Sequence, residues 1–127
     1  ISSSIEHHAV LHTVEHWAHT GAVTTAFVQL QPSGEVDYEH LEQLLKEAPA
    51  KTLVSLMHAN NEIGVLLDID RVGALCRQYN AVFHSDCVQT VGHYPINLSA
   101  IGVHFISGAG HKFHGPKGVG ILYVNEN

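Results

Sequence analysis

Blocks of apolar and polar positions follow one another along the chain and predict a regular succession of helices and strands. Apolar residues recur at helical spacing in the ranges 6–19, 37–47 and 68–79. Gly21 is a stop signal for the first helix, and Asp37 is a suitable N-cap for the second. Runs rich in β-branched and aromatic residues predict strands at 23–30, 52–57, 81–85, 103–107 and 119–124.

The order and composition of these segments predict the fold class. Several strands are continuous apolar runs rather than alternating ones, which is typical of a parallel sheet that is buried on both faces. The link between the last two strands is too short for a helical crossover, so we expect these two strands to be antiparallel. We predict an α/β fold with a mostly parallel sheet and helices on both faces, formed by a single domain over residues 1–127.

The composition narrows the class of protein. The chain has 127 residues, of which 45% are apolar, and this content is typical of a packed globular domain. Its net charge of −6 disfavours non-specific binding of nucleic acid, which needs a basic surface. No apolar run approaches the roughly 20 residues of a membrane helix. Cys76 and Cys87 are too few for a disulfide scaffold, so we expect a reducing, cytoplasmic location with no nucleic-acid or membrane partner.

Polar residues follow three of the predicted strands, where the strands end. The range 58–64 follows one strand, Asp86 and Gln89 follow the next, and Lys112 comes after a third. In open α/β sheets, ligands bind outside the carboxyl ends of the strands. Asp86 and Lys112 lie 112 − 86 = 26 residues apart on successive strands, so we expect them to meet in one crevice. An amine beside a carboxylate suits pyridoxal 5'-phosphate, whose aldehyde bonds to lysine and whose ring nitrogen needs an anion. Gln89 can form a hydrogen bond to the ring oxygen.

The chain contains 12 histidines, and those of the first helix fall into two groups. His8, His12, His16 and His19 share one polar face, opposite the apolar stripe. Their spacing permits adventitious metal binding, but a solvated face is the favoured interpretation, and we predict no metal site. A non-catalytic, histidine-rich metal-binding module remains the alternative from a different class. His7 falls on the apolar side and is expected to point inward, where it is either a core histidine or a ligand contact.

Four segments carry a recognisable combination of motifs: E-H-H-A-V at 6–10, M-H-A-N-N-E-I-G at 57–64, H-S-D-C-V-Q at 84–89 and G-H-K-F-H-G-P-K-G at 110–118. In this order they resemble the cysteine desulfurases, which are class V members of the fold-type I pyridoxal-phosphate enzymes. The resemblance covers nearly the whole chain. It implies the large domain of a pyridoxal-phosphate-dependent transferase and pyridoxal 5'-phosphate as the cofactor.

The resemblance also implies a role for individual residues around the ring of the cofactor. Lys112 would form the Schiff base, Asp86 would pair with the ring nitrogen, and Gln89 would contact the ring oxygen. His7 would stack on the ring and help Lys112 to move protons at the substrate. Asn61 would contact the ring region.

The phosphate group of the cofactor has fewer matching residues. His111 would contact it, whereas a serine that many family members carry three residues before the lysine is Ala109 here. One hydrogen bond to phosphate is therefore not expected.

The activity implied is the conversion of cysteine to alanine with formation of an enzyme persulfide, which supplies sulfur for iron–sulfur clusters. The implied partners are cysteine, a second copy in a homodimer and sulfur-acceptor proteins. A selenocysteine lyase or another class V lyase or aminotransferase is the alternative. A pseudo-enzyme that only associates with partners is a further one.

The family's desulfurases are about three times as long as this chain. Neither Cys76 nor Cys87 matches the position of the persulfide-forming cysteine. The amino-terminal phosphate loop, the arginine that binds the substrate carboxylate and the carboxyl-terminal small domain have no counterpart in the 127 residues. We therefore expect the central part of a large domain, inactive by itself.

Overall fold

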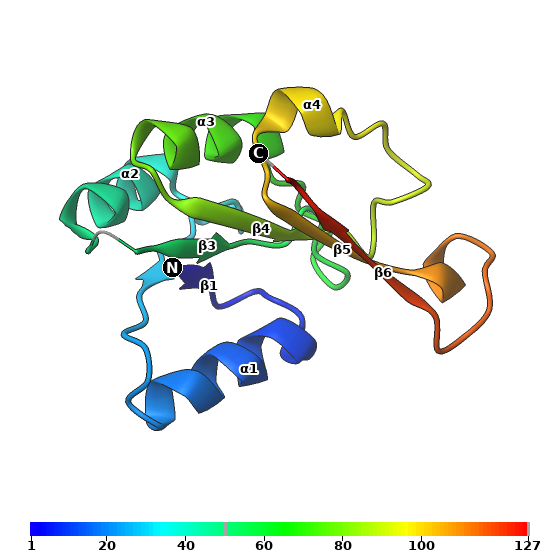
Figure 1. The fold of residues 1–127 in the computed structure, drawn as a ribbon, viewed down its shortest axis with the longest axis horizontal. Coiled ribbons are helices and arrows are strands. Elements are labelled where there is room, and N and C mark those ends of the chain that lie inside the picture. The colour runs from blue at the N-terminus through cyan, green and yellow to red at the C-terminus, as the bar shows by residue number, and fades with distance from the viewer. Residues whose placement is uncertain (50, 127) are drawn as a thin grey trace.

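The computed structural model describes residues 1–49 and 51–126. Its elements, in chain order, are β1 (Ser2–Ser3), α1 (His8–His19), β2 (Phe27–Val28), α2 (Tyr38–Glu47), β3 (Leu53–Ser55), α3 (Ile69–Gln78), β4 (Val82–Asp86), α4 (Leu98–Ile101), β5 (Phe105–Ala109), the 3₁₀ turn η1 (Gly110–Lys112) and β6 (Gly120–Val124) (Figure 1). Across the described ranges, no helix has the length and apolar character needed to cross a membrane.

The main sheet has four strands in the order β3-β4-β5-β6. The strands β3, β4 and β5 are parallel, with Ser55 paired to His84 and Asp86 paired to Ser107. The last strand, β6, runs antiparallel to β5, as the short connection predicts. The mostly parallel α/β sheet and its antiparallel last pair are thus confirmed.

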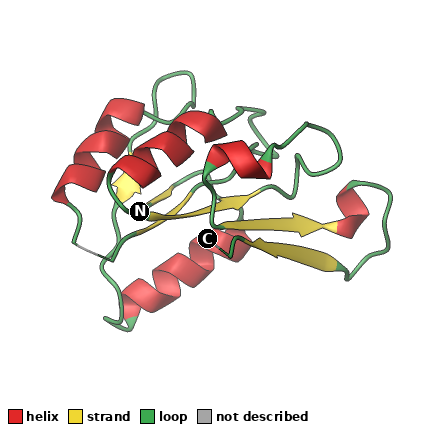
Figure 2. Ribbon diagram, turned by 45° about the horizontal axis from the view of Figure 1, so that its top comes forward, coloured by secondary structure: helices red, strands yellow, loops and turns green. Residues whose placement is uncertain are grey.

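Helices lie on both sides of this sheet (Figures 1 and 2). The helices α2, α3 and α4 cover one side, and α1 lies on the other. Phe83 of β4 is fully buried in the core beneath α2 and α3, together with Val54, Val72 and Cys76. Because successive strand residues point to opposite faces, Asp86 lies on the face opposite Phe83 and towards α1. The predicted arrangement of helices on both faces is confirmed.

The two amphipathic helices α2 and α3 both begin after an aspartate cap, of which Asp37 was predicted and Asp68 was expected as the first residue of its helix. The Asp37 Oδ1 accepts hydrogen bonds from the amides of Glu39 at 3.0 Å and His40 at 3.1 Å. The Asp68 Oδ1 accepts one from the amide of Arg71 at 3.0 Å. These bonds satisfy amides of the first turn that have no partner within the helix.

Two short elements differ from the sequence-based prediction. The strand expected over 23–30 is reduced to Phe27–Val28, because its partner β1 offers only Ser2 and Ser3 for pairing. The helix α4 was not expected, since a single turn shows no periodicity. It is packed closely against α3, where a Cβ atom at Gly73 would collide with the carbonyl oxygen of Ile101.

Candidate functional site

The carboxyl ends of β3, β4 and β5 lie at one edge of the sheet, and backbone hydrogen bonds hold the segments that follow them together. The amide of His58, after β3, donates to the carbonyl of Asp86 at 2.9 Å. The amide of Cys87, after β4, donates to the carbonyl of Ser107 in β5 at 2.9 Å. The segments predicted to carry the chemistry are therefore neighbours.

Asp86 is the last residue of β4, and its side chain is buried, with only 6% exposed. Its Oδ1 accepts a hydrogen bond from the amide of Val88 at 2.9 Å, which shapes the turn after the strand. Within residues 1–49 and 51–126, the ion pair between Lys46 and Glu42 is the only one, so Asp86 has no cationic side chain as partner. A buried carboxylate without a cationic partner can accept a hydrogen bond from a positively charged ring nitrogen.

Lys112 ends the η1 turn that follows β5, and its side chain is exposed. Its carbonyl oxygen lies 2.8 Å from His93 Nε2, which ties η1 to the segment after β4. A Cβ atom at Gly115 would lie 2.8 Å from the carbonyl oxygen of Gly110, so only glycine fits the tight turn after the lysine. Lys112 and Asp86 are therefore brought to neighbouring loops, although their side chains form no ion pair in the described part of the chain.

Gln89 and His111 lie close in the sequence to Asp86 and Lys112. Gln89 is half-buried in the turn directly after β4, three residues from Asp86. His111 is exposed in η1, next to Lys112. Both lie in the loops where the sequence placed them.

His7 and Asn61 meet at a pocket of about 250 Å³ between the start of α1 and the loop after β3. His7 is the N-cap of α1, and its Nδ1 accepts a hydrogen bond from the amide of Ala9 at 3.2 Å. The prediction that His7 points into the core is wrong: its side chain is exposed, and the buried neighbour is Glu6. Capping holds the ring at the end of the helix, whereas the helical wheel treats it as part of the helix face.

Glu6 was not identified as a candidate from the sequence, although it lies in a motif of the resemblance. It is 4% exposed, and its Oε1 accepts hydrogen bonds from Ser3 Oγ at 2.8 Å and from the amide of Met57 at 2.9 Å. Burial raises the pKa of Glu6 to about 7, and the negative charge of Asp86 adds to this effect. A glutamate after a short strand gives no sequence signal of such burial.

His58 is a second buried residue that the sequence did not single out. Its Nδ1 lies 2.9 Å from Thr90 Oγ1, and the Thr90 hydroxyl donates to the carbonyl of Cys87 at 3.3 Å. Which of the two groups donates in the His58–Thr90 hydrogen bond depends on the tautomer of the imidazole. Burial lowers the pKa of His58, which favours the neutral ring.

Hydrogen bonds connect polar side chains of the three parallel strands on the face that carries Asp86. His84 lies two residues before Asp86 on the same strand and therefore on the same face. Its Nδ1 lies 2.8 Å from Ser55 Oγ, and its Nε2 lies 3.3 Å from Ser107 Oγ. Burial lowers the pKa of His84, although the negative charge of Asp86 opposes this shift. The ring thus connects three adjacent strands on the face that carries the acid.

The histidine-rich helix does not form a metal site in the structure. His8 and His12 stack with their ring centroids 4.9 Å apart. No three histidine, cysteine or acidic side chains within the described ranges are grouped so that they could hold a metal ion. Structural zinc sites have four such ligands, and two stacked imidazoles supply half of that number.

The whole chain, residues 1–127, matches the family model described as aminotransferase class-V. It is 41% identical over 126 residues to the cysteine desulfurase IscS of Dictyoglomus turgidum, covering 99% of this chain and 31% of that protein. It is 45% identical over 124 residues to the IscS of Pectobacterium atrosepticum, covering 98% of this chain and 30% of that protein. The chain thus spans about 30% of the length of these relatives.

Solved structures share the fold. The NifS-like protein from Rickettsia africae superimposes with a TM-score of 0.86 at 40% identity, covering 95% of this chain and 32% of that one. The apo cysteine desulfurase from Thermococcus onnurineus gives a TM-score of 0.90 at 28% identity, covering 98% and 31%. The arrangement of strands and helices around the candidate site is therefore one that these proteins also have.

Proposed function

Because the chain belongs to the aminotransferase class-V family, we propose that it forms the cofactor-binding part of a pyridoxal-phosphate-dependent cysteine desulfurase. The names of its relatives support this activity. The observation that carries it is the buried carboxylate of Asp86, which lacks a cationic partner within the described residues and lies beside the loop of Lys112. In this proposal residues 1–127 are one domain, the central part of a large domain.

The donor set fits the proposed cofactor. Pyridoxal 5'-phosphate, when bound, withdraws electrons from the substrate carbon through its ring. Asp86 would stabilise the protonated ring nitrogen, since a buried carboxylate interacts strongly with a nearby positive charge. The amine of Lys112 is exposed, so it can bond to the aldehyde and afterwards carry protons at the substrate.

Four further residues would hold and orient the cofactor. His7 would present its ring face to the cofactor from the start of α1, and Asn61 would face it across the pocket that both residues line. Gln89 would donate a hydrogen bond to the ring oxygen from the turn after Asp86. His111 would contact the phosphate from η1.

The proposed reaction transfers the sulfur atom of cysteine to an enzyme thiol, which leaves alanine and an enzyme persulfide. Neither cysteine of the chain suits that thiol role, because Cys76 and Cys87 are both fully buried. Burial raises the pKa of Cys76 to about 12 and also raises the pKa of Cys87, whereas the nucleophile in such a step is a thiolate. The persulfide would therefore form on a cysteine outside these 127 residues.

The activity is proposed for a protein that contains this chain within the length of its relatives. Such a protein would act as a homodimer in the cytoplasm and pass its persulfide sulfur to acceptor proteins for iron–sulfur cluster assembly. These partners follow from the proposed activity.

The test uses the full-length protein that contains this chain. It is incubated with pyridoxal 5'-phosphate, reduced with borohydride and mapped by mass spectrometry, and we expect the label on Lys112. Lys117→Ala, in the neighbouring turn, is the matched control and should label as the wild type does, whereas Lys112→Ala should not label. Labelling spread over Lys46, Lys51 and Lys117 would contradict the assignment.

The second part of the test is the reaction itself. With cysteine as substrate, the wild type should release alanine and sulfide in the presence of a thiol reductant, and Lys112→Ala should not. If the protein is labelled on Lys112 but turns over selenocysteine and not cysteine, the desulfurase activity is excluded and the assignment of the cofactor stands.

A further inference from the structure

Glu6 is a buried acid that the proposed reaction does not use. It directly precedes His7, and its Oε1 accepts hydrogen bonds from Ser3 Oγ at 2.8 Å and from the Met57 amide at 2.9 Å. Ser3 ends β1 and Met57 follows β3. One carboxyl oxygen thus connects the segment that carries His7 to the carboxyl end of β3.

The second oxygen of Glu6 is in a different state. Its Oε2 is buried and has no hydrogen-bond partner among the described residues. A buried charged oxygen without a donor is costly, and a neutral carboxyl group is much less so. Burial accordingly raises the pKa of Glu6 to about 7, while the Met57 and Ser3 hydrogen bonds oppose the shift and Asp86 adds to it. Glu6 therefore changes its charge near neutral pH.

Glu6 also lines the pocket of about 250 Å³ that His7 and Asn61 share. Glu6 also lines a second, smaller cavity of about 10 Å³, together with Met57. The other titratable groups around Glu6 are those of the two cavities and of the end of β4: His7, His8, Glu35, Glu62 and Asp86. Of these groups, Asp86 acts on Glu6 through its negative charge, which disfavours the charged form of Glu6.

We propose that Glu6 is a positioning residue for His7: its neutral carboxyl group holds the His7 segment against the end of β3, and its charged form loosens that segment. The contact with the end of β3 is made by the hydrogen bonds that Oε1 accepts, and the difference between the two charge forms comes from Oε2, which is buried without a partner among the described residues. Its effect on the cofactor rests on the proposed function, in which His7 contacts the ring.

The direction of the pH effect follows from proton linkage. The pKa of Glu6 is raised in the folded protein, from 4.5 to about 7. Its contribution to holding the segment is therefore complete below pH 4.5 and is lost as the pH rises through about 7. Above that pH, opening of the segment to water becomes easier, because water can then solvate Oε2.

Hydrogen exchange of the full-length protein, without cofactor, tests the structural part. In the wild type, backbone exchange over residues 4–11, corrected for the intrinsic effect of pH, should be several-fold faster well above pH 7 than well below it. Glu6→Gln keeps an oxygen acceptor and has no charge, so its exchange should be slow at both values. Glu6→Ala should exchange fast at both.

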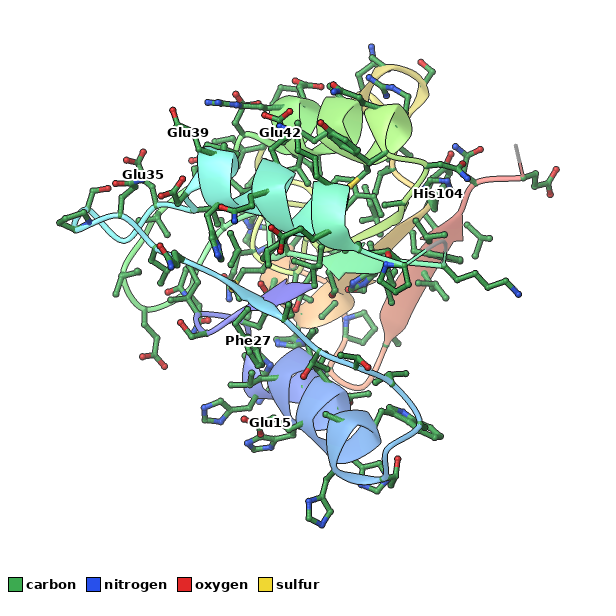
Figure 3. All side chains as sticks on the ribbon, turned by 90° about the vertical axis from the view of Figure 1, so that its left-hand side faces the viewer. Glu15, Phe27, Glu35, Glu39, Glu42 and His104 are labelled. Carbon is green, nitrogen blue, oxygen red and sulfur yellow. The ribbon has the colours of Figure 1, made fainter. Side chains whose placement is uncertain are left out.

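Glu15→Gln is the matched control, since Glu15 is an acid of the adjoining helix α1 but is exposed. Figure 3 shows Glu15 on α1, on the far side of the molecule from Glu39 and Glu42 of α2. It should keep the pH dependence of the wild type. The inference is overturned if exchange over 4–11 is independent of pH in the wild type, or if Glu6→Gln keeps the full dependence.

The affinity for pyridoxal 5'-phosphate tests the effect on the site. The wild type should lose several-fold more affinity than Glu6→Gln as the pH rises through 7, while both retain the label on Lys112. Equal losses would overturn the link to His7. Failure of labelling on Lys112 would instead refute the proposed function, and the exchange result would still decide the role of Glu6.

Discussion

The two faces of the main sheet differ in how far their apolar pattern is buried. Under α2 and α3, Phe83 and Cys76 are fully buried, and both helices place apolar residues in the core. On the other side, α1 has no buried residue, and Trp17 in its apolar stripe is 51% exposed. The comparison shows that an amphipathic pattern reveals which face of a helix is apolar, and does not reveal what covers that face.

The polar residues on this side of the sheet also differ in how far they are shielded from solvent. Asp86 and His84 lie on the less covered face of the sheet and are still well shielded, because strands on either side and hydrogen-bonded neighbours surround them. The histidines of α1 lie on a single helix with solvent around it. Fixed, shielded polar groups such as Asp86 are suited to bind a cofactor because they lose little freedom when it binds.

The largest expected effect tests the packing difference. In the 127-residue chain, Phe83→Ala should lower the free energy of unfolding by about 3–5 kcal/mol, because it opens a cavity in the core. Trp17→Ala should cost less than about 1 kcal/mol, because half of the ring is already in water. Urea denaturation measures both. Equal costs would show that α1 is packed as tightly as the core.

A smaller effect is expected on the chemistry at the shielded acid. In the full-length protein, Asp86→Asn should keep the fold and reduce kcat for cysteine by about 100-fold to 1,000-fold, the loss found when one preorganised electrostatic contact is removed. The amide keeps the hydrogen bond to Val88 but cannot balance a positive ring nitrogen. Steady-state alanine production is measured, with Glu15→Gln as control. Turnover of the Asn variant close to the wild type would remove Asp86 from the role of ring partner.

The smallest effect concerns the histidines of α1. The double change His12→Ala/His16→Ala should leave the affinity for zinc or nickel, and the cysteine turnover of the full-length protein, unchanged within about 2-fold, since exposed side chains outside a site contribute little. Metal titration by calorimetry measures the affinity. A large loss of metal affinity would favour the histidine-rich metal-binding module over the solvated face.

The sequence predicted best where local chemistry decides the outcome. The Asp37 cap and the antiparallel pair β5–β6 depend on neighbours in the chain or on a short connection, and both were predicted. The placement of Asp86 at the end of β4 followed from the strand pattern. The strand β1 was missed because two polar residues, Ser2 and Ser3, give no strand pattern and pair only because β2 lies beside them.

The sequence predicted which strand-end loops carry the candidate residues, and did not predict how the side chains are oriented. The motifs of the resemblance pointed to Lys112 and Asp86, and the structure brings their loops together; their roles remain predictions. The inward orientation expected for His7 was wrong, because its ring caps α1. Glu6 and His58 were missed, since their burial depends on partners about 30–50 residues away, Met57 for Glu6 and Thr90 for His58.

The sequence alone determined the alternation of helices and strands, the capped start of α2, and the motifs that identify the family. These depend on periodicity, on single side chains beside their own backbone and on residue identity at fixed spacing. Only the tertiary structure decided that Glu6 is buried with one oxygen unpartnered, that burial lowers the pKa of His58 and that α1 stays exposed. The reason is that burial, and the pKa changes that burial causes, depend on which distant segments pack around a residue.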